Sequence, residues 1–136
     1  MVPLKILFVL LLALFLGGSH PALATDFGGA CGYPVSEDPN SQKEFIDIGN
    51  QFLVRNVRIH QHSQGAMVTG EIYNGLRGFF TFALFKVQLF NADCTYQGAN
   101  NFALDKLEFG VTRPFRVIVP NVQRTDVATY HIEFLP

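Results

Sequence analysis

Hydrophobic and polar residues alternate most clearly along residues 79–91. Phe85, Val87 and Leu89 fall on one side of an extended chain, and Lys86 and Gln88 fall on the other. This period of two predicts a β-strand with one buried face and one solvated face. The start of the segment departs from the rule, because positions expected on the solvated face are also apolar: Phe80, Phe82 and Leu84.

Shorter stretches of strand-like sequence fill the rest of the chain. They cover residues 49–62, 66–74, 94–98, 102–107, 113–119 and 130–134, with turn residues between them. Residues 45–48 are either an edge strand or a helical turn, and residues 122–128 hold one helical turn at most. We therefore predict an all-β fold, an antiparallel β-sandwich of about seven strands.

Two expectations concern how these strands pack. The strand that ends at Asn74 should pair with the strand over 79–91, directly or with one strand between them, because Asn74-Gly75 is a strong turn dipeptide. The two sheets should close on a shared interior made of Val68, Ile72, Phe85, Val87, Leu89, Phe115, Val117 and Tyr130.

The chain divides into three parts. Residues 1–24 have the features of a signal peptide: Lys5, an apolar run over residues 6–16, and Ala22-Leu23-Ala24 as the cleavage site. The apolar run is shorter than the roughly 20 residues that a membrane-spanning helix needs. Residues 25–50 are rich in turn-forming residues and read as an extended leader, and residues 51–136 form the domain. We expect a secreted or periplasmic protein, cleaved near Ala24.

The predicted mature chain contains two cysteines, Cys31 and Cys94. In an exported protein they are expected to form a disulfide, with free thiols as the alternative. Lipidation of Cys31 is a further alternative, but Gly28-Gly29-Ala30 precedes it rather than a leucine-led motif. Without a C-x-x-C pair, the sequence supports neither a redox motif nor a zinc knuckle.

Composition argues against several functional classes. The formal net charge is −1 and no run of basic residues occurs, so nucleic acid and anionic membranes are poor candidate partners. None of the serines lies in a G-x-S-x-G motif, and no glycine-rich phosphate loop is present. Asp93 or Asp105 with His131 could support acid–base chemistry, but no motif singles them out. We expect no enzymatic activity and no cofactor.

His60 and His62 are the candidate metal ligands. Residues two apart on a strand project from the same face, so the pair could chelate a metal ion. A third ligand would have to come from His131 or Glu71. The alternative is a pair of solvated histidines near a strand end.

The apolar outer positions Phe80, Phe82 and Leu84 form the candidate interface. Each side chain gains about 1.5–3 kcal/mol when it is buried rather than exposed, so something should cover them. One possibility is internal, with the leader folded over this face through Phe27, Tyr33 or Phe45 and held by Cys31. The other possibilities are a partner protein, a second copy of the chain, or an apolar ligand.

Three segments resemble the FxLYD-domain proteins of bacterial and archaeal envelopes. Residues 68–74, Val-Thr-Gly-Glu-Ile-Tyr-Asn, resemble the family's V-x-G-E-V-x-N strand. Residues 87–91, Val-Gln-Leu-Phe-Asn, occupy the place of F-x-L-Y-D, and residues 110–115 resemble P-G-E-x-x-P-F without its Pro and Glu. The resemblance covers about residues 51–136. It implies an immunoglobulin-like sandwich without established catalysis, in which Gly70 permits close packing, Asn74 caps a turn and Leu89 fills the core.

Together these features predict an exported, non-catalytic binding or structural module of the cell envelope. Its expected partner is another envelope protein or a second copy of itself. The alternative is a secreted metal- or small-ligand-binding protein that uses His60 and His62.

Overall fold

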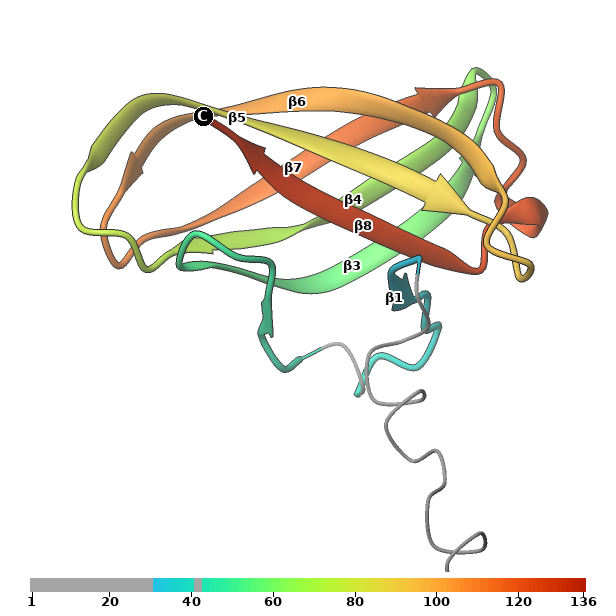
Figure 1. Ribbon diagram of the computed structural model, residues 1–136, viewed down its shortest axis with the longest axis horizontal. Coiled ribbons are helices and arrows are strands. Elements are labelled where there is room, and N and C mark those ends of the chain that lie inside the picture. The colour runs from blue at the N-terminus through green and yellow to red at the C-terminus, as the bar shows by residue number, and fades with distance from the viewer. Residues whose placement is uncertain (1–30, 41–42) are drawn as a thin grey trace, which may run out of the picture.

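A computed structural model describes residues 31–40 and 43–136 of the chain. The predicted signal peptide and Phe27 lie outside these described residues. No helix in the described part of the chain is long and apolar enough to cross a membrane. The elements are the strands β1 (Tyr33–Pro34), β2 (Ile46–Asp47), β3 (Phe52–His62), β4 (Gly65–Asn74), β5 (Phe79–Phe90), β6 (Tyr96–Glu108), β7 (Thr112–Pro120) and β8 (Thr129–Leu135), with the short 3-10 helix η2 (Arg124–Asp126) before β8 (Figure 1).

The strands form two antiparallel four-stranded sheets that share one interior. The β5 sheet has the order β1-β8-β5-β6, and the β4 sheet has the order β2-β3-β4-β7. β4 pairs with β7, and β5 pairs with β8. The chain therefore passes from one sheet to the other after β4, after β6 and after β7. Such crossings between sheets are typical of the Greek-key connections of immunoglobulin-like sandwiches. The predicted all-β antiparallel sandwich is confirmed.

Two predicted details of the strand arrangement are wrong. β4 does not pair with β5, because the two strands belong to different sheets. Residues 96–108 form one strand rather than two, because β5 provides pairing partners along almost the whole of β6. Gly98 lies within this strand, where a side chain would be too close to the other sheet. A Cβ there would lie 3.0 Å from Cγ1 of Val119 and 2.8 Å from Cγ2 of Val122.

The core is assembled from the inward-facing positions of both sheets. All eight residues predicted for the shared interior are buried, which confirms the alternation found in the sequence. The ring of Phe102 on β6 stacks on Phe115 of β7, with centroids 4.6 Å apart. Gly70 allows this packing, because a Cβ there would lie 2.7 Å from Cε1 of Phe115.

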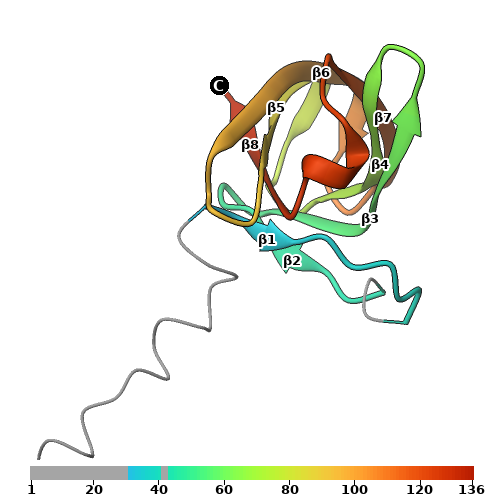
Figure 2. The same cartoon turned by 90° about the vertical axis from the view of Figure 1, so that its right-hand side faces the viewer.

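Residues 31–40 and 43–48, called the strap below, join both sheets. Tyr33 in β1 pairs with Tyr130 of β8, and Ile46 in β2 pairs with Val54 of β3. The hydroxyl of Tyr33 donates a hydrogen bond to the Asp47 carbonyl at 2.8 Å. Figure 2 shows β1 and β2 crossing the side of the sandwich where β8 and β3 face each other. The segment predicted as a leader therefore extends the sheets, and its 45–48 stretch provides an edge strand.

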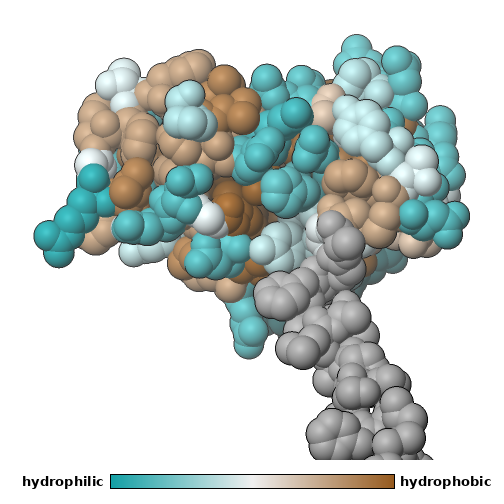
Figure 3. Space-filling view, viewed as in Figure 1, coloured by the Kyte–Doolittle hydropathy of each residue, from teal (hydrophilic) through white to brown (hydrophobic). Residues whose placement is uncertain are grey.

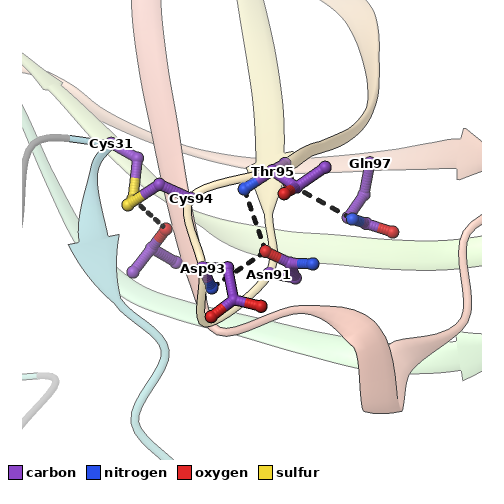
Figure 4. Close-up of a disulfide and its surroundings, with 7 residues drawn as sticks. Cys31, Asn91, Asp93, Cys94, Thr95 and Gln97 are labelled. Atoms are coloured by element: carbon purple, nitrogen blue, oxygen red, sulfur yellow. Dashed lines mark hydrogen bonds between the residues drawn. A yellow bond between two sulfur atoms is a disulfide. The ribbon is translucent and has the colours of Figure 1, made fainter.

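A disulfide fixes the start of the strap (Figure 4). Cys31 is bonded to Cys94, and their Cα atoms lie 5.5 Å apart, a separation that suits a disulfide. Asn91 shapes the turn that presents Cys94, because its Oδ1 accepts hydrogen bonds from the backbone N–H groups of Asp93 and Thr95, both at 2.9 Å. The backbone N–H of Cys94 donates to the Asn91 carbonyl at 3.0 Å.

Asn74 connects the two sheets at the opposite end of the sandwich. Its side chain is fully buried; Nδ2 donates to the Leu107 carbonyl at 3.1 Å, and Oδ1 accepts from the Leu76 N–H at 2.8 Å. Its backbone N–H donates to the Val111 carbonyl, and its carbonyl accepts from the Gly110 N–H. One residue thus links β4, the β4–β5 connection, β6 and the β6–β7 turn, and it caps the turn as the resemblance implied.

Replacing Asn74 by Ala should lower the free energy of unfolding by about 1–3 kcal/mol, because a buried carbonyl and a buried N–H would lose their partner. Urea denaturation measures this loss. The matched control is Asn100→Ala, which removes an exposed amide that donates to the Ile118 carbonyl at 2.8 Å and should cost less than about 0.5 kcal/mol. Equal losses in the two variants would contradict the role assigned to Asn74.

The double variant Cys31→Ser/Cys94→Ser should lose up to about 4 kcal/mol of stability in the chain-entropy view, because the disulfide closes a loop with a sequence separation of 63. The sandwich should still fold, since its core lies mainly outside the strap. Thermal unfolding with and without dithiothreitol tests this. Dithiothreitol should destabilise the wild type and leave the double variant unchanged.

Candidate functional site

The predicted interface residues do not share one face. Phe82 is 63% exposed and Leu84 is half-buried on the outer face of the β5 sheet. Phe80 instead packs into the core, with its ring centroid 5.9 Å from that of Phe52 and 5.6 Å from that of Phe134. The prediction that Phe80 lies on the outer face is therefore wrong.

The reason is a change of face within β5 and β6. Phe80 and Ala83 are three residues apart, yet both face the interior, so Thr81 and Phe82 between them are both exposed. Their partners on β6, Leu107 and Leu104, are likewise three apart and both buried. Lys106 of β6 has a positive φ of 50°, and the backbone there leaves the regular β-conformation. The sequence prediction assumed that side chains alternate strictly along the whole of β5. It therefore placed Phe80 on the outer face instead of in the interior.

Two exposed aromatic residues that the sequence reasoning did not select lie at the start of β5 and in the β6–β7 turn. Phe79 is 56% exposed and Phe109 is 52% exposed. They are neighbours because the N–H of Phe109 donates to the Gly78 carbonyl at 3.1 Å. The sequence signal for the exposure of Phe109 was its position next to Gly110 in a predicted turn. We call Phe79, Phe82, Leu84 and Phe109 the phenylalanine surface.

The phenylalanine surface lies at one end of the molecule. Figure 3 shows hydrophobic surface gathered at the left-hand end in that view, over the β4–β5 connection and the β6–β7 turn. Leu84 pairs with Leu135 of β8 on one side and with Ala103 of β6 on the other. The apolar surface therefore continues across the outer face of three strands.

In the described part of the chain, the strap does not cover the phenylalanine surface. Tyr33 packs on Tyr130, with ring centroids 5.9 Å apart. Phe45 packs on Tyr73 at 5.7 Å, and the Arg55 guanidinium lies 4.5 Å from the centre of the Phe45 ring. The described part of the strap contacts the β3–β8 side, so the possibility that Tyr33 or Phe45 covers the outer face of β5 is contradicted, while Phe27 lies outside the described residues.

The histidines are not brought together with a third ligand. His60 pairs with Met67 and His62 with Gly65 in the β4 sheet, whereas His131 lies in the other sheet opposite Gln88. Nδ1 of His62 accepts a hydrogen bond from the Gln64 N–H at 3.1 Å. Among residues 31–40 and 43–136, no group of three or more His, Cys, Asp or Glu could hold a metal ion.

Glu71, the other suggested third ligand, belongs to a polar cluster at a bulge in β3. The register shifts between Arg55 and Arg58, and Asn56 has a positive φ of 55°, so the bulge turns the Asn56 amide toward β4. Asn56 Nδ2 donates to Glu71 Oε2, and Arg55 Nε donates to the same oxygen at 3.1 Å. The Asn56 bond, assisted by Arg55, lowers the pKa of Glu71, although partial burial acts in the opposite direction.

Comparison with known proteins gives one structural similarity. The chain matches no protein-family model. It also matches no curated protein. It is similar to the crystal structure of a DUF1425 family member from Shewanella sp. pv-4, with 13% sequence identity and a TM-score of 0.44, over 68% of this chain and 86% of that chain. The resemblance to FxLYD-domain proteins stays a prediction, and the fold is assigned from the strand order and register of this chain.

Glu71→Gln should reduce stability at neutral pH by less than about 1 kcal/mol, since the ion pair is partly exposed. A lowered folded-state pKa gives stability that is present above the unfolded value near 4.5 and lost as pH falls through the folded value. The stability difference between wild type and Glu71→Gln should therefore shrink as the pH falls from about 6 to about 3. Urea denaturation across this range checks it. Exposed Glu108→Gln is the control, and a difference that does not vary with pH would contradict the assignment.

Proposed function

We propose that this protein is an exported, non-catalytic binding module of the cell envelope that contacts a partner protein through the phenylalanine surface. The observation that carries the proposal is the exposure of Phe79, Phe82 and Phe109, each more than half exposed, at one end of the sandwich. The predicted signal peptide and the disulfide between Cys31 and Cys94 are compatible with export.

The size of the hydrophobic effect supports a protein partner. Burying a phenylalanine side chain contributes about 1.5–3 kcal/mol, so three exposed rings represent a large unused contribution to binding. Single exposed apolar residues are ordinary, but contiguous apolar patches on a soluble protein commonly mark interaction sites. Aromatic residues are also enriched at the buried centres of protein interfaces.

The outer face of the β5 sheet has an aromatic part, in which Phe79 and Phe82 pair with Glu108 and Asp105 of β6, and a polar part. Beyond Leu84, the outward positions of β5 are Lys86, Gln88 and Phe90. Lys86 and Gln88 pair with Glu133 and His131 of β8, and Phe90 packs on the exposed Tyr96, with ring centroids 6.1 Å apart. The polar part resembles ordinary solvated sheet surface with a cross-strand pair of opposite charges. The most exposed phenylalanine side chains are therefore concentrated at one end, beside Asp105 and Glu108.

A photo-crosslinking residue in place of Phe82 should give a covalent adduct in the source organism's cell envelope. The matched position is Gln88, which lies on the same face of the same strand and should give none. Mass spectrometry identifies the protein in the adduct, and a second copy of the chain would appear as a dimer. Equal labelling from both positions, or none from either, would contradict a specific interface at Phe82.

With the partner purified, Phe82→Asp should weaken binding at least about tenfold, because a charge would be placed where an aromatic anchor is buried. Thr81→Asp places the same charge on the adjacent exposed residue and should have a smaller effect. Calorimetry measures binding, and thermal unfolding shows whether the variants remain folded. A folded Phe82→Asp protein with unchanged affinity would contradict the proposal.

A further inference from the structure

A cavity of about 580 Å³ lies between the strap and the sandwich. The strap contributes Val35, Glu44 and Ile46 to its lining, and the sandwich contributes Arg55, Val57 and Tyr130. Ligand pockets commonly enclose about 300–1,000 Å³ and combine an apolar lining with a few polar groups. This strap cavity has that composition, and it lies on a different side of the molecule from the phenylalanine surface.

A buried tyrosine, Tyr130, lines the strap cavity on the side of the sandwich. Tyr130 is only 3% exposed, and in the described part of the chain its hydroxyl makes no hydrogen bond. Burial, with a smaller contribution from nearby Tyr33, raises the pKa of Tyr130, so the hydroxyl keeps its proton. A buried hydroxyl without a partner among the described residues is costly, and a polar atom of a ligand in the cavity would satisfy it.

The charges at the mouth of the cavity favour a cation. Arg55 is paired with Glu71 at 3.1 Å, and Glu37 is paired with Arg124 at 3.0 Å. Among the described residues Glu44 has no such partner, and Glu44 is exposed and lines the cavity. With the two ion pairs neutral, the mouth carries the single negative charge of Glu44.

We propose that the strap cavity binds a small organic ammonium ion with an apolar chain. The ammonium group lies at the Glu44 carboxylate, and the chain packs on Val35, Ile46 and Val57. The Tyr130 hydroxyl is available to a polar atom at the inner end of the ligand. The strap, held by its disulfide and by β1 and β2, forms one wall of the site.

The test compares three probes with the same chain and different head groups: hexylammonium chloride, sodium hexanoate and 1-hexanol. The chain has 4 tyrosines, so ring-labelled tyrosine gives four NMR signals, and Tyr130→Phe identifies the signal of Tyr130. Hexylammonium should shift the Tyr130 signal saturably, with a dissociation constant on the order of 1 mM for so small a ligand. Tyr96, which does not line the cavity, should not respond.

Two variants test the role of charge. Glu44→Gln should weaken hexylammonium binding about fivefold, the size of a partly exposed ion pair, and leave 1-hexanol binding unchanged. Glu108→Gln, a matched change at an exposed glutamate on β6, should alter neither. The proposal is overturned if hexanoate binds as tightly as hexylammonium, if no probe shifts Tyr130, or if Glu44→Gln binds hexylammonium like the wild type.

Discussion

The buried amide of Asn74 is the constraint on which the arrangement of the sheets depends. β4 and β5 follow each other in sequence but belong to different sheets, so the chain must cross between the sheets directly after Asn74. Such a crossing exposes backbone groups that no strand ladder can satisfy. Asn74 supplies the missing partners to Leu76 and Leu107 and bonds through its own backbone to the β6–β7 turn. With this end fixed, β5 can pair with β6 and β8.

The strap covers the β3–β8 side of the sandwich and is attached at the end opposite Asn74. Each of its two strands has only two residues, which is too little pairing to hold a segment in place by itself. The disulfide, the hydrogen bond from Tyr33 to Asp47 and the ion pair between Glu37 and Arg124 supply the remaining attachment. Because the strap bridges two sheets rather than lying flat on one, it encloses a cavity above Tyr130.

Each of the two candidate binding regions lies next to one of these features, the chain crossing at Asn74 or the strap. The phenylalanine surface lies where the β4–β5 connection and the β6–β7 turn meet, near Asn74. The strap cavity lies on the β3–β8 side. The first presents three phenylalanine side chains that are each more than half exposed, and the second is lined by apolar residues with Glu37, Glu44 and Arg55 among them.

The sequence by itself determined the strand class and the eight predicted core positions, because alternation of side chains and turn-forming residues are local properties of the backbone. It led to the Cys31–Cys94 disulfide only as one alternative, on the ground that the chain is expected to be exported. The buried faces of Phe85, Val87 and Leu89 followed directly from their spacing. Only the tertiary structure decided which strands pair, that β6 continues through Gly98, and that Phe80 turns inward while Phe79 and Phe109 remain exposed. The site at Glu44 and Tyr130 also joins residues distant in sequence. These outcomes depend on contacts between sheets and on one change of face in β5 and β6. Strict alternation of inward and outward side chains does not predict such a change.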